Sequence, residues 1–443
     1  MSRTKKVTVQ SVKGMHDILP EEQFYWAYIY KKAQSLIEDY GFQRIDTPIL
    51  EQTALFTRAI GEDTDAVEKE MYSFKTKGKD DVSLRPEPTS GIVRAYIEHG
   101  MHTWSHPILL WTSGPMFRHD NPQAGRTRQF HQIGIEIFGD DSAAADAQSI
   151  YIGYKIYESI GLKNVIVKLN SVGDSNCRPQ YIKALKDHYK RHSRKICNTC
   201  QRRIKTNPLR LLDCKQEDCA AVSKDAPQIV DYLDETCKKH FKGLLEFLDE
   251  LGVPYLLDHR LVRGLDYYTR TAFEYLIEQN PSQDQEAEKT ESAKKMPDIA
   301  LGGGGRYDKL VEFMGGPKTP ATGWGIGIER IVMAMKIQNI EPTKTKWQPK
   351  VFIAQLGELA KRKGLSLFEE FRKAGLVAKA SFGRDSIKSQ LRMAHKFEIP
   401  YTIIVGQKEA LDGSVIIREM KTGVQESVPM DRAVEIIKSK IKK

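Results

Sequence analysis

The chain has 443 residues, of which 40% are hydrophobic and 28% charged. This balance is typical of a globular protein of about three domains and excludes a disordered, collagen-like or membrane-embedded chain. No apolar run approaches the roughly 20 residues that a membrane-spanning helix needs, and the basic amino terminus lacks an apolar stretch of signal-peptide length. We therefore expect a cytoplasmic protein without membrane association.

The net charge of +10 is unevenly distributed along the chain. Residues 183–215 hold eleven Lys/Arg against two Asp/Glu, and residues 350–443 hold nineteen against eleven, so the remainder is net acidic. Two basic segments favour a polyanion that contacts the protein at two places, because phosphate neutralisation dominates nucleic-acid affinity. Solvated helix faces are the alternative interpretation.

The first predicted element is a helix over residues 20–40, where apolar side chains recur at helical spacing before Gly41. Extended runs follow, around residues 44–51, 108–118, 129–138, 272–277 and 321–327. Strands joined by hairpins and long excursions imply a mostly antiparallel sheet. No glycine loop marks a dinucleotide fold.

Two segments interrupt this pattern. Residues 170–250 are crowded with Lys, His and Cys at helical spacing and predict a helical insertion. Residues 279–298 contain almost no large apolar side chains and predict a surface loop. After Trp347, apolar runs at residues 351–354, 377–380 and 401–405 alternate with helical patterns and predict a carboxy-terminal α/β domain.

Residues 118–138 carry the most informative motif. Within 132–137, three isoleucines alternate with Gln132, Gly134 and Glu136, so a strand presents an apolar face and a polar face. A turn-rich connector lets the preceding strand fold back and bring Arg118 near the polar face. The pattern predicts a binding site, although a solvent-exposed hairpin face explains it equally well.

Two further segments could supply polar groups. Residues 84–90 hold Glu87 in a proline-framed turn suited to an ammonium group, or form an ordinary loop. Residues 261–270 combine arginines, an aspartate and paired tyrosines, which suit a planar ligand with phosphate nearby; a surface turn is the alternative.

Two glycine-rich runs differ in what they predict. Residues 302–308 (GGGGRYD) allow a ligand close to the backbone or form a flexible hinge. Residues 322–331 alternate glycines along a strand and end in Glu329 and Arg330 at a helix start, which predicts a phosphate clamp. No Walker loop is present.

Four of the six cysteines lie within 23 positions of one another: Cys197, Cys200, Cys214 and Cys219. Their spacing is compatible with a tetrahedral zinc site, although the second pair is wider than in the commonest zinc ribbons. Cytosolic thiols with this spacing can also be metal-free, so we assign no metal to them from the sequence, and a disulfide is disfavoured in the cytosol. We expect Cys177 and Cys237 to be structural.

Taken together, these segments resemble a class II aminoacyl-tRNA synthetase, and within that class the histidyl-tRNA synthetase family of bacterial type. Residues 44–74 resemble the first class motif, at the family's dimer interface. Residues 118–138 resemble the second motif and 323–330 the third. RGLDYY at 263–268 and GGGGRYD at 302–308 resemble the two signatures peculiar to the histidine enzymes.

The resemblance implies an α+β and α/β multidomain fold. Its parts are a class II catalytic domain with a mostly antiparallel sheet flanked by helices (residues 1–170 and 250–340), a basic helical insertion (171–249) and an α/β anticodon-binding domain (349–443). The segment 382–392 lies in that last domain. The resemblance also implies a homodimer.

The family's functional residues carry over position by position. The resemblance assigns ATP to Arg118, Arg126, Arg263 and Arg330. It assigns the substrate histidine to Glu87, Thr89, Gln132, Glu136, Tyr267, Tyr268 and Tyr307. Arg263 and Arg118 would be catalytic, and Arg126 and Arg128 would lie towards the adenylate and the tRNA acceptor end. Pro88 stands where the family pattern usually has glycine.

The implied activity is ATP-dependent attachment of L-histidine to tRNA(His) through a histidyl-adenylate, with Mg²⁺ and without a covalent enzyme intermediate. The basic insertion would contact the acceptor arm. The competing interpretation is a non-catalytic, histidine-binding regulatory paralogue that serves a biosynthetic phosphoribosyltransferase. Such a paralogue is expected to lack the anticodon domain and the key arginines. A second competitor is a nucleic-acid-binding accessory protein with an inactive class II shell.

Overall fold

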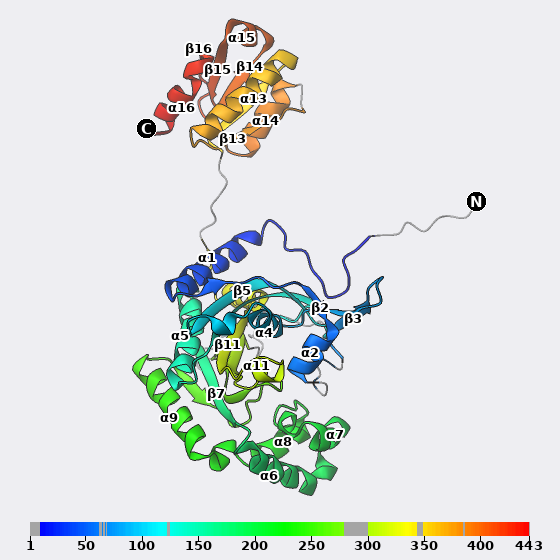
Figure 1. The fold of residues 1–443 in the computed structure, drawn as a ribbon. Coiled ribbons are helices and arrows are strands. Elements are labelled where there is room, and N and C mark those ends of the chain that lie inside the picture. Colours follow the sequence, from blue (N-terminus) through cyan, green and yellow to red (C-terminus); the bar gives the residue numbers. More distant parts are fainter. Residues whose placement is uncertain are drawn as a thin grey trace, which may run out of the picture. The chain divides into compact units, whose positions relative to one another are not determined.

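The computed structural model describes residues 9–61, 64, 67, 69–121, 125–278, 300–342, 349–383 and 386–442. The predicted surface loop at 279–298 lies outside these residues. The chain divides into two compact units, residues 1–343 and 344–443, which are drawn in Figure 1 and are described separately below.

The first unit is built on an eight-stranded sheet with the order β1-β5-β6-β11-β10-β9-β7-β8. Its strands are β1 (Gln43–Arg44), β5 (Ile108–Phe117), β6 (Gln129–Phe138), β7 (Val165–Gly173), β8 (Tyr255–Leu257), β9 (Thr269–Ile277), β10 (Gly302–Arg306) and β11 (Ala321–Gly327). The two outermost pairs, β1–β5 and β7–β8, are parallel and the five inner pairs antiparallel. The prediction of a mostly antiparallel sheet is confirmed.

The four-glycine run is strand β10, in the interior of this sheet. Gly302–Arg306 pairs with β9 along one edge and with β11 along the other. A segment bonded on both sides cannot serve as a hinge, so the alternative of a flexible hinge is wrong.

One face of the sheet is covered by four helices: α1 (Gln23–Asp39), α5 (Ala143–Ile160), α9 (Glu235–Glu250) and α12 (Ile328–Ile337). Their apolar side chains form a single core with the sheet, and Ile133, Ile135 and Ile137 of β6 lie fully inside it. Each buried isoleucine contributes roughly 1.5–3 kcal/mol. The alternation along β6 thus orients the strand as predicted.

The opposite face carries a second, smaller set of elements. These are β2 (Leu50–Gln52), α2 (Thr53–Ile60), β3 (Tyr72–Lys75), β4 (Asp81–Leu84), α4 (Thr89–Glu98), η1 (Met101–Thr103) and α11 (Leu310–Phe313). Strands β2, β4 and β3 form a separate antiparallel sheet. Ile92, Val93 and Tyr96 of α4 pack with Phe138 and Tyr307 of the large sheet, which holds the start of α4 against β6.

The region between β7 and β8 is helical (green in Figure 1). It comprises α6 (Arg178–Arg191), η2 (Ser193–Lys195), α7 (Asn198–Thr206), η3 (Pro208–Leu211), α8 (Glu217–Lys224), η4 (Ile229–Tyr232) and α9. Its core also contains Val262, Tyr268 and Ala272 of the body, whereas Leu244 and Leu248 of α9 pack into the main core. The domain boundaries at 171 and 249 therefore stay a prediction.

The second unit is an α/β domain with a five-stranded sheet in the order β13-β12-β14-β15-β16. The strands are β12 (Val351–Gln355), β13 (Ala378–Ala380), β14 (Tyr401–Val405), β15 (Ser414–Glu419) and β16 (Gln425–Pro429). The helices are α13 (Glu358–Lys373), α14 (Ile387–Lys396), α15 (Gln407–Asp412), η5 (Met430–Arg432) and α16 (Ala433–Lys442). Among the described helices of both units, none has the length and apolar character of a membrane span.

Candidate active site

A pocket of about 1130 Å³ opens on the polar face of the large sheet. It is lined by Gln132 of β6, Glu274 of β9, Gly302 of β10, and Gly325 and Gly327 of β11, together with residues 125–127 and 260–265. Part of the insertion forms the remaining wall, including Arg203, Arg210 and Lys215. Most of the lining groups are polar or charged, which suits a charged ligand.

Glycines of β11 leave space on this face of the sheet for the side chains of the neighbouring strand β6. Gly323 lies opposite Glu136 in the register of β11 and β6. A Cβ at Gly323 would overlap the Glu136 carboxylate and the Ile135 carbonyl oxygen. A Cβ at Gly325 would lie 3.3 Å from the Gln132 amide. The alternating glycines therefore make room for the polar residues of β6.

Four arginines gather in the pocket: Arg118, Arg126, Arg263 and Arg330. Arg118 donates to the Pro86 carbonyl at 2.9 Å and lies over the ring of Phe130. Arg126 contacts Asp120 at 3.3 Å. These contacts orient guanidinium groups that come from segments far apart in the sequence.

Arg263 lies flat against the glycine-rich strand and pairs with Glu274 at 2.5 Å. A Cβ at Gly303 would be 2.7 Å from its guanidinium, so the approach depends on glycine. Burial has the largest single effect and disfavours the charge of Arg263, but Glu274, Tyr268 and Tyr267 together outweigh it and raise the pKa of Arg263.

The pKa of Arg330 is shifted in the opposite direction from that of Arg263. Burial lowers its pKa to about 10, and the neighbouring charges of Arg126, Arg118 and Arg263 add to the effect. Its guanidinium donates to the carbonyls of Gly125 and Ala300. Mutual repulsion among the four cations makes this part of the pocket a site for a multiply charged anion.

Glu136 is buried at the other end of the polar strand face, with 1% of its surface exposed. The alternative of a solvent-exposed hairpin face is therefore wrong. Thr89 donates to its carboxylate at 2.7 Å, and the Tyr307 hydroxyl donates to its other oxygen. Burial raises the pKa of Glu136 to about 8, although both hydrogen bonds oppose the shift.

Glu87 caps the amino terminus of helix α4. Its carboxylate accepts hydrogen bonds from the backbone N–H groups of Thr89 and Ser90, at 2.7 and 2.8 Å, and from the Ser90 hydroxyl. Pro88 occupies the capping position, where its missing N–H leaves no donor unpaired. The proline is thus compatible with the local geometry.

Three tyrosines connect the two signature segments. The ring centroids of Tyr267 and Tyr268 are 4.7 Å apart, and those of Tyr267 and Tyr307 are 5.6 Å apart. Burial raises the pKa values of all three phenols, so they remain neutral hydrogen-bonding groups at physiological pH. The fold thus places a compact cluster of tyrosines beside Glu136.

Of the predicted site residues, five line the pocket, namely Arg118, Arg126, Gln132, Arg263 and Arg330, whereas Glu87, Thr89, Glu136 and the three tyrosines are not part of its wall. Gln132 joins the two ends of the site, and its Oε1 is buried without a hydrogen-bond partner. Arg128 points elsewhere: its guanidinium donates to the carbonyls of Asp120 and Lys13, at 3.4 Å each. Arg126, but not Arg128, is part of the pocket wall.

Comparison with known proteins decides the family. The model of the histidyl-tRNA synthetase family matches residues 14–331, and that of an anticodon binding domain matches residues 350–440. The chain belongs to the histidyl-tRNA synthetase family. A histidine–tRNA ligase of Dehalococcoides mccartyi is 43% identical over 98% of this chain and 100% of its own length. One of Desulforamulus reducens is 41% identical over 97% of this chain and 98% of its own length.

Solved structures support the synthetase fold. Apo histidyl-tRNA synthetase of S. aureus is 35% identical, has a TM-score of 0.76, and the match covers 97% of this chain and all of that one. A Bacillus halodurans protein described as an ATP phosphoribosyltransferase regulatory subunit/histidyl-tRNA synthetase has a TM-score of 0.60 at 20% identity over 90% of this chain and 98% of that one, which shows the shared fold alone.

Sequence reasoning missed several residues of this synthetase site. Glu274 pairs with Arg263, and its alternation with the buried Phe273 and Tyr275 is a signal that could have identified it. Asn207 of the insertion donates to Asp266 at 2.8 and 2.9 Å. No sequence pattern links those two residues, because 59 positions separate them.

Proposed function

We propose that this protein is a histidine–tRNA ligase. It activates L-histidine with ATP to form histidyl-adenylate and diphosphate, and then transfers the histidyl group to tRNA(His), which releases AMP. The observation that carries the proposal is the polar face of one sheet, with four convergent arginines in the pocket at one end and the buried, hydrogen-bonded carboxyl group of Glu136 at the other, in a chain of this family.

In the first step, the histidine carboxylate attacks the α-phosphorus of ATP, and diphosphate leaves. The charge that develops on the phosphate oxygens requires fixed cations, and Arg263 and Arg118 supply them without reorganising. Arg330 and Arg126 hold the remaining phosphate charge. Their mutual repulsion in the free enzyme, expressed in the lowered pKa of Arg330, is relieved when the polyanion binds.

Histidine is recognised beside the pocket, at the Glu136 end of the polar sheet face. Glu136 and Tyr268 contact the imidazole ring, which both donates and accepts hydrogen bonds. Glu87, Thr89 and Gln132 hold the α-amino group; the partnerless Oε1 of Gln132 is an acceptor suited to an ammonium. Tyr267 and Tyr307 enclose the side chain, and Tyr307 orients Glu136 through its hydroxyl.

Mg²⁺ accompanies ATP in this reaction. Carboxylate oxygens are the protein ligands it prefers, and Glu274 and Asp120 line the pocket among the arginines, so the donor set fits the ion. When bound, the ion neutralises phosphate charge. Glu274 also holds Arg263 in place through their ion pair.

tRNA binding follows from the distribution of positive charge. In the second step, a ribose hydroxyl of the terminal adenosine attacks the activated carbonyl, and AMP leaves. The basic insertion at 171–249 faces the same pocket through Arg203, Arg210 and Lys215 and binds the acceptor arm. The basic domain at 349–443 binds the anticodon; residues 350–440 match an anticodon-binding family model.

The proposal includes a homodimer in the cytoplasm, where tRNA(His) is charged. Residues 44–74 form the interface. Three large apolar side chains of this segment are exposed in the single chain, Ile49 at 42%, Leu50 at 41% and Phe74 at 49%. Burying them against a second copy would remove apolar surface from water. Sedimentation of the wild type and of Leu50→Asp/Phe74→Asp tests this: the wild type should be dimeric and the variant monomeric.

ATP–diphosphate exchange with each amino acid in turn tests the proposed function. We expect exchange with histidine alone, followed by transfer of histidine to tRNA(His). Exchange with no amino acid would indicate the regulatory or accessory class of protein instead, and exchange with a different amino acid would overturn the assigned specificity.

A further inference from the structure

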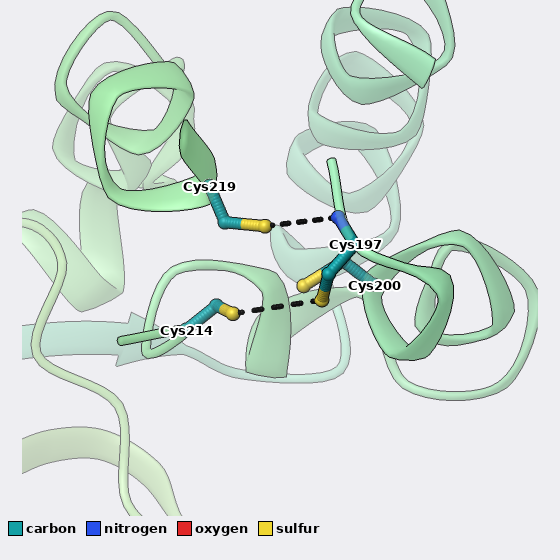
Figure 2. A group of neighbouring side chains, drawn as sticks. All are labelled: Cys197, Cys200, Cys214 and Cys219. Carbon is teal, nitrogen blue, oxygen red and sulfur yellow. Dashed lines mark hydrogen bonds between the residues drawn. The ribbon is translucent and has the colours of Figure 1, made fainter. Parts of the chain in front are cut away.

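The four-cysteine cluster of the insertion is the feature that the proposed reaction leaves unused. Cys197 precedes α7, Cys200 lies in its first turn, Cys214 follows η3 and Cys219 lies in α8. All four thiols are free. Figure 2 shows that three chain segments direct their sulfurs toward one centre.

The spacing of the sulfurs matches a metal-thiolate site. The Cys197 and Cys214 sulfurs are 3.9 Å apart, and all four lie within 4.8 Å of one another. A disulfide would need about 2 Å. A tetrahedral Zn²⁺ with sulfur ligands at about 2.3 Å separates those sulfurs by roughly 3.8 Å.

The surroundings of the sulfurs also favour a metal. Cys200 and Cys219 are fully buried, and Ile196, Ile204 and Leu211 pack in the same core. The backbone N–H of Cys197 donates to the Cys219 sulfur at 3.2 Å, an outer contact of the kind that orients a ligating thiolate.

Local charge and secondary structure point the same way. Zn²⁺ with four thiolates carries a net charge of −2, and residues 193–219 hold seven Lys/Arg against three Asp/Glu, which offsets it. The helices that carry the ligands are short, with nine residues in α7 and eight in α8. Such short elements are marginal without a cross-link.

A second cysteine cluster in the described part of the chain makes an instructive contrast. Asp174, Cys177, Asp234 and Cys237 also lie within 4.8 Å of one another. Their carboxylates, however, already act as caps: Asp234 accepts from the Cys237 N–H at 2.8 Å and Asp174 from the Asn176 N–H at 2.9 Å. This cluster therefore serves as the control.

We propose that Cys197, Cys200, Cys214 and Cys219 hold one structural Zn²⁺ ion, which fixes the segment 193–219 as a wall of the substrate pocket. Cys197 and Cys214 line the pocket that also contains the four arginines. Asn207 of the same segment holds Asp266, between Arg263 and the two tyrosines. The metal thus supports the position of the signature segment 263–268.

Metal analysis of the full-length protein, purified in reductant without chelator, tests the site directly. We expect about one zinc per chain in the wild type and in Cys177→Ser/Cys237→Ser, and none in Cys200→Ser/Cys214→Ser. Zinc-free wild type, or zinc retained by Cys200→Ser/Cys214→Ser, would overturn the proposal.

Cobalt substitution keeps the test independent of whether a variant folds. Wild type stripped of metal and reloaded with Co²⁺ alone should develop the visible and thiolate-to-metal charge-transfer bands of a tetrahedral four-sulfur site. Octahedral cobalt bands would contradict the assignment. Zinc content and cobalt spectra are both measured independently of histidine activation. A negative result for the zinc site would therefore not contradict the proposed function. Absence of exchange activity would likewise not contradict the zinc site.

Discussion

Burial disfavours charge at both ends of the site, but the two ends differ in how many charged groups they hold. At the arginine end, like charges share a partly exposed space, and burial with neighbouring cations lowers the pKa of Arg330 to about 10. At the carboxylate end, Glu136 is enclosed and its pKa rises to about 8. The arginine end is therefore suited to a multiply charged anion. The Glu136 end holds few charges and recognises its ligand through hydrogen bonds. Changes at each end should therefore have different signatures.

Removing a cation aligned with the reacting phosphate should have the largest effect. Arg263→Ala is expected to lower kcat for histidine-dependent exchange by about 10²–10³-fold, the scale for losing one preorganised electrostatic donor. Arg263→Lys should retain part of the rate, since it keeps the charge but loses the planar fork. The exposed Arg191→Ala is the control; wild-type exchange in Arg263→Ala would remove this residue from the mechanism.

A single methyl group should disrupt the carboxylate end. Gly323→Ala would force the Glu136 carboxyl group and the Ile135 carbonyl aside, and leaving a buried hydrogen-bonding group without its partner costs roughly 1–3 kcal/mol. We expect kcat/KM for histidine to fall by up to about 100-fold while the KM for ATP changes little. Gly383→Ala, where a Cβ meets nothing within 4 Å, is the matched control. An equal loss of ATP affinity would show that the two ends are not separable.

Arg330→Met should weaken ATP binding more than it affects histidine. We expect the KM for ATP to rise about 10-fold or more, because a charge-assisted contact is lost. The free energy of unfolding should change by less than about 1 kcal/mol, because removing a buried like charge offsets the two lost hydrogen bonds. ATP titration and urea unfolding measure the two quantities. A large destabilisation without a change in ATP affinity would assign Arg330 a structural role.

The smallest expected effect is the change in the free energy of unfolding with pH that is due to Glu136. The pKa of Glu136 is raised from 4.5 to about 8, so its contribution to stability is fully present below about pH 4.5 and is lost as pH rises through about 8. The wild type should lose stability relative to Glu136→Gln between pH 5 and pH 8.5, by a few kcal/mol at most, in urea titrations. Glu246→Gln, an exposed carboxylate, is the control. Parallel pH profiles for wild type and Glu136→Gln would contradict the raised pKa.

Sequence patterns predicted correctly which face of a strand or helix is buried, because the periodicity of a single element is enough to show this. The isoleucines of β6 alternate at the period of a strand, so their burial and the polar face opposite them followed directly. The same reasoning could have reached Glu274 on β9. It failed for the glycines 302–305, because four residues without side chains carry no periodicity, and only pairing on both edges makes them a strand.

By itself, then, the sequence determined the chemical groups available: the arginines, the carboxylates, the clustered thiols and the faces on which single strands present them. Tertiary structure decided which of these groups meet. Thr89, Glu136 and Tyr307 come from three separate segments, and Arg263 reaches Glu274 of β9 because Gly303, the cross-strand neighbour of Glu274, has no side chain in the way. The protonation of Glu136 also belongs to the fold, since burial, not residue type, sets its pKa.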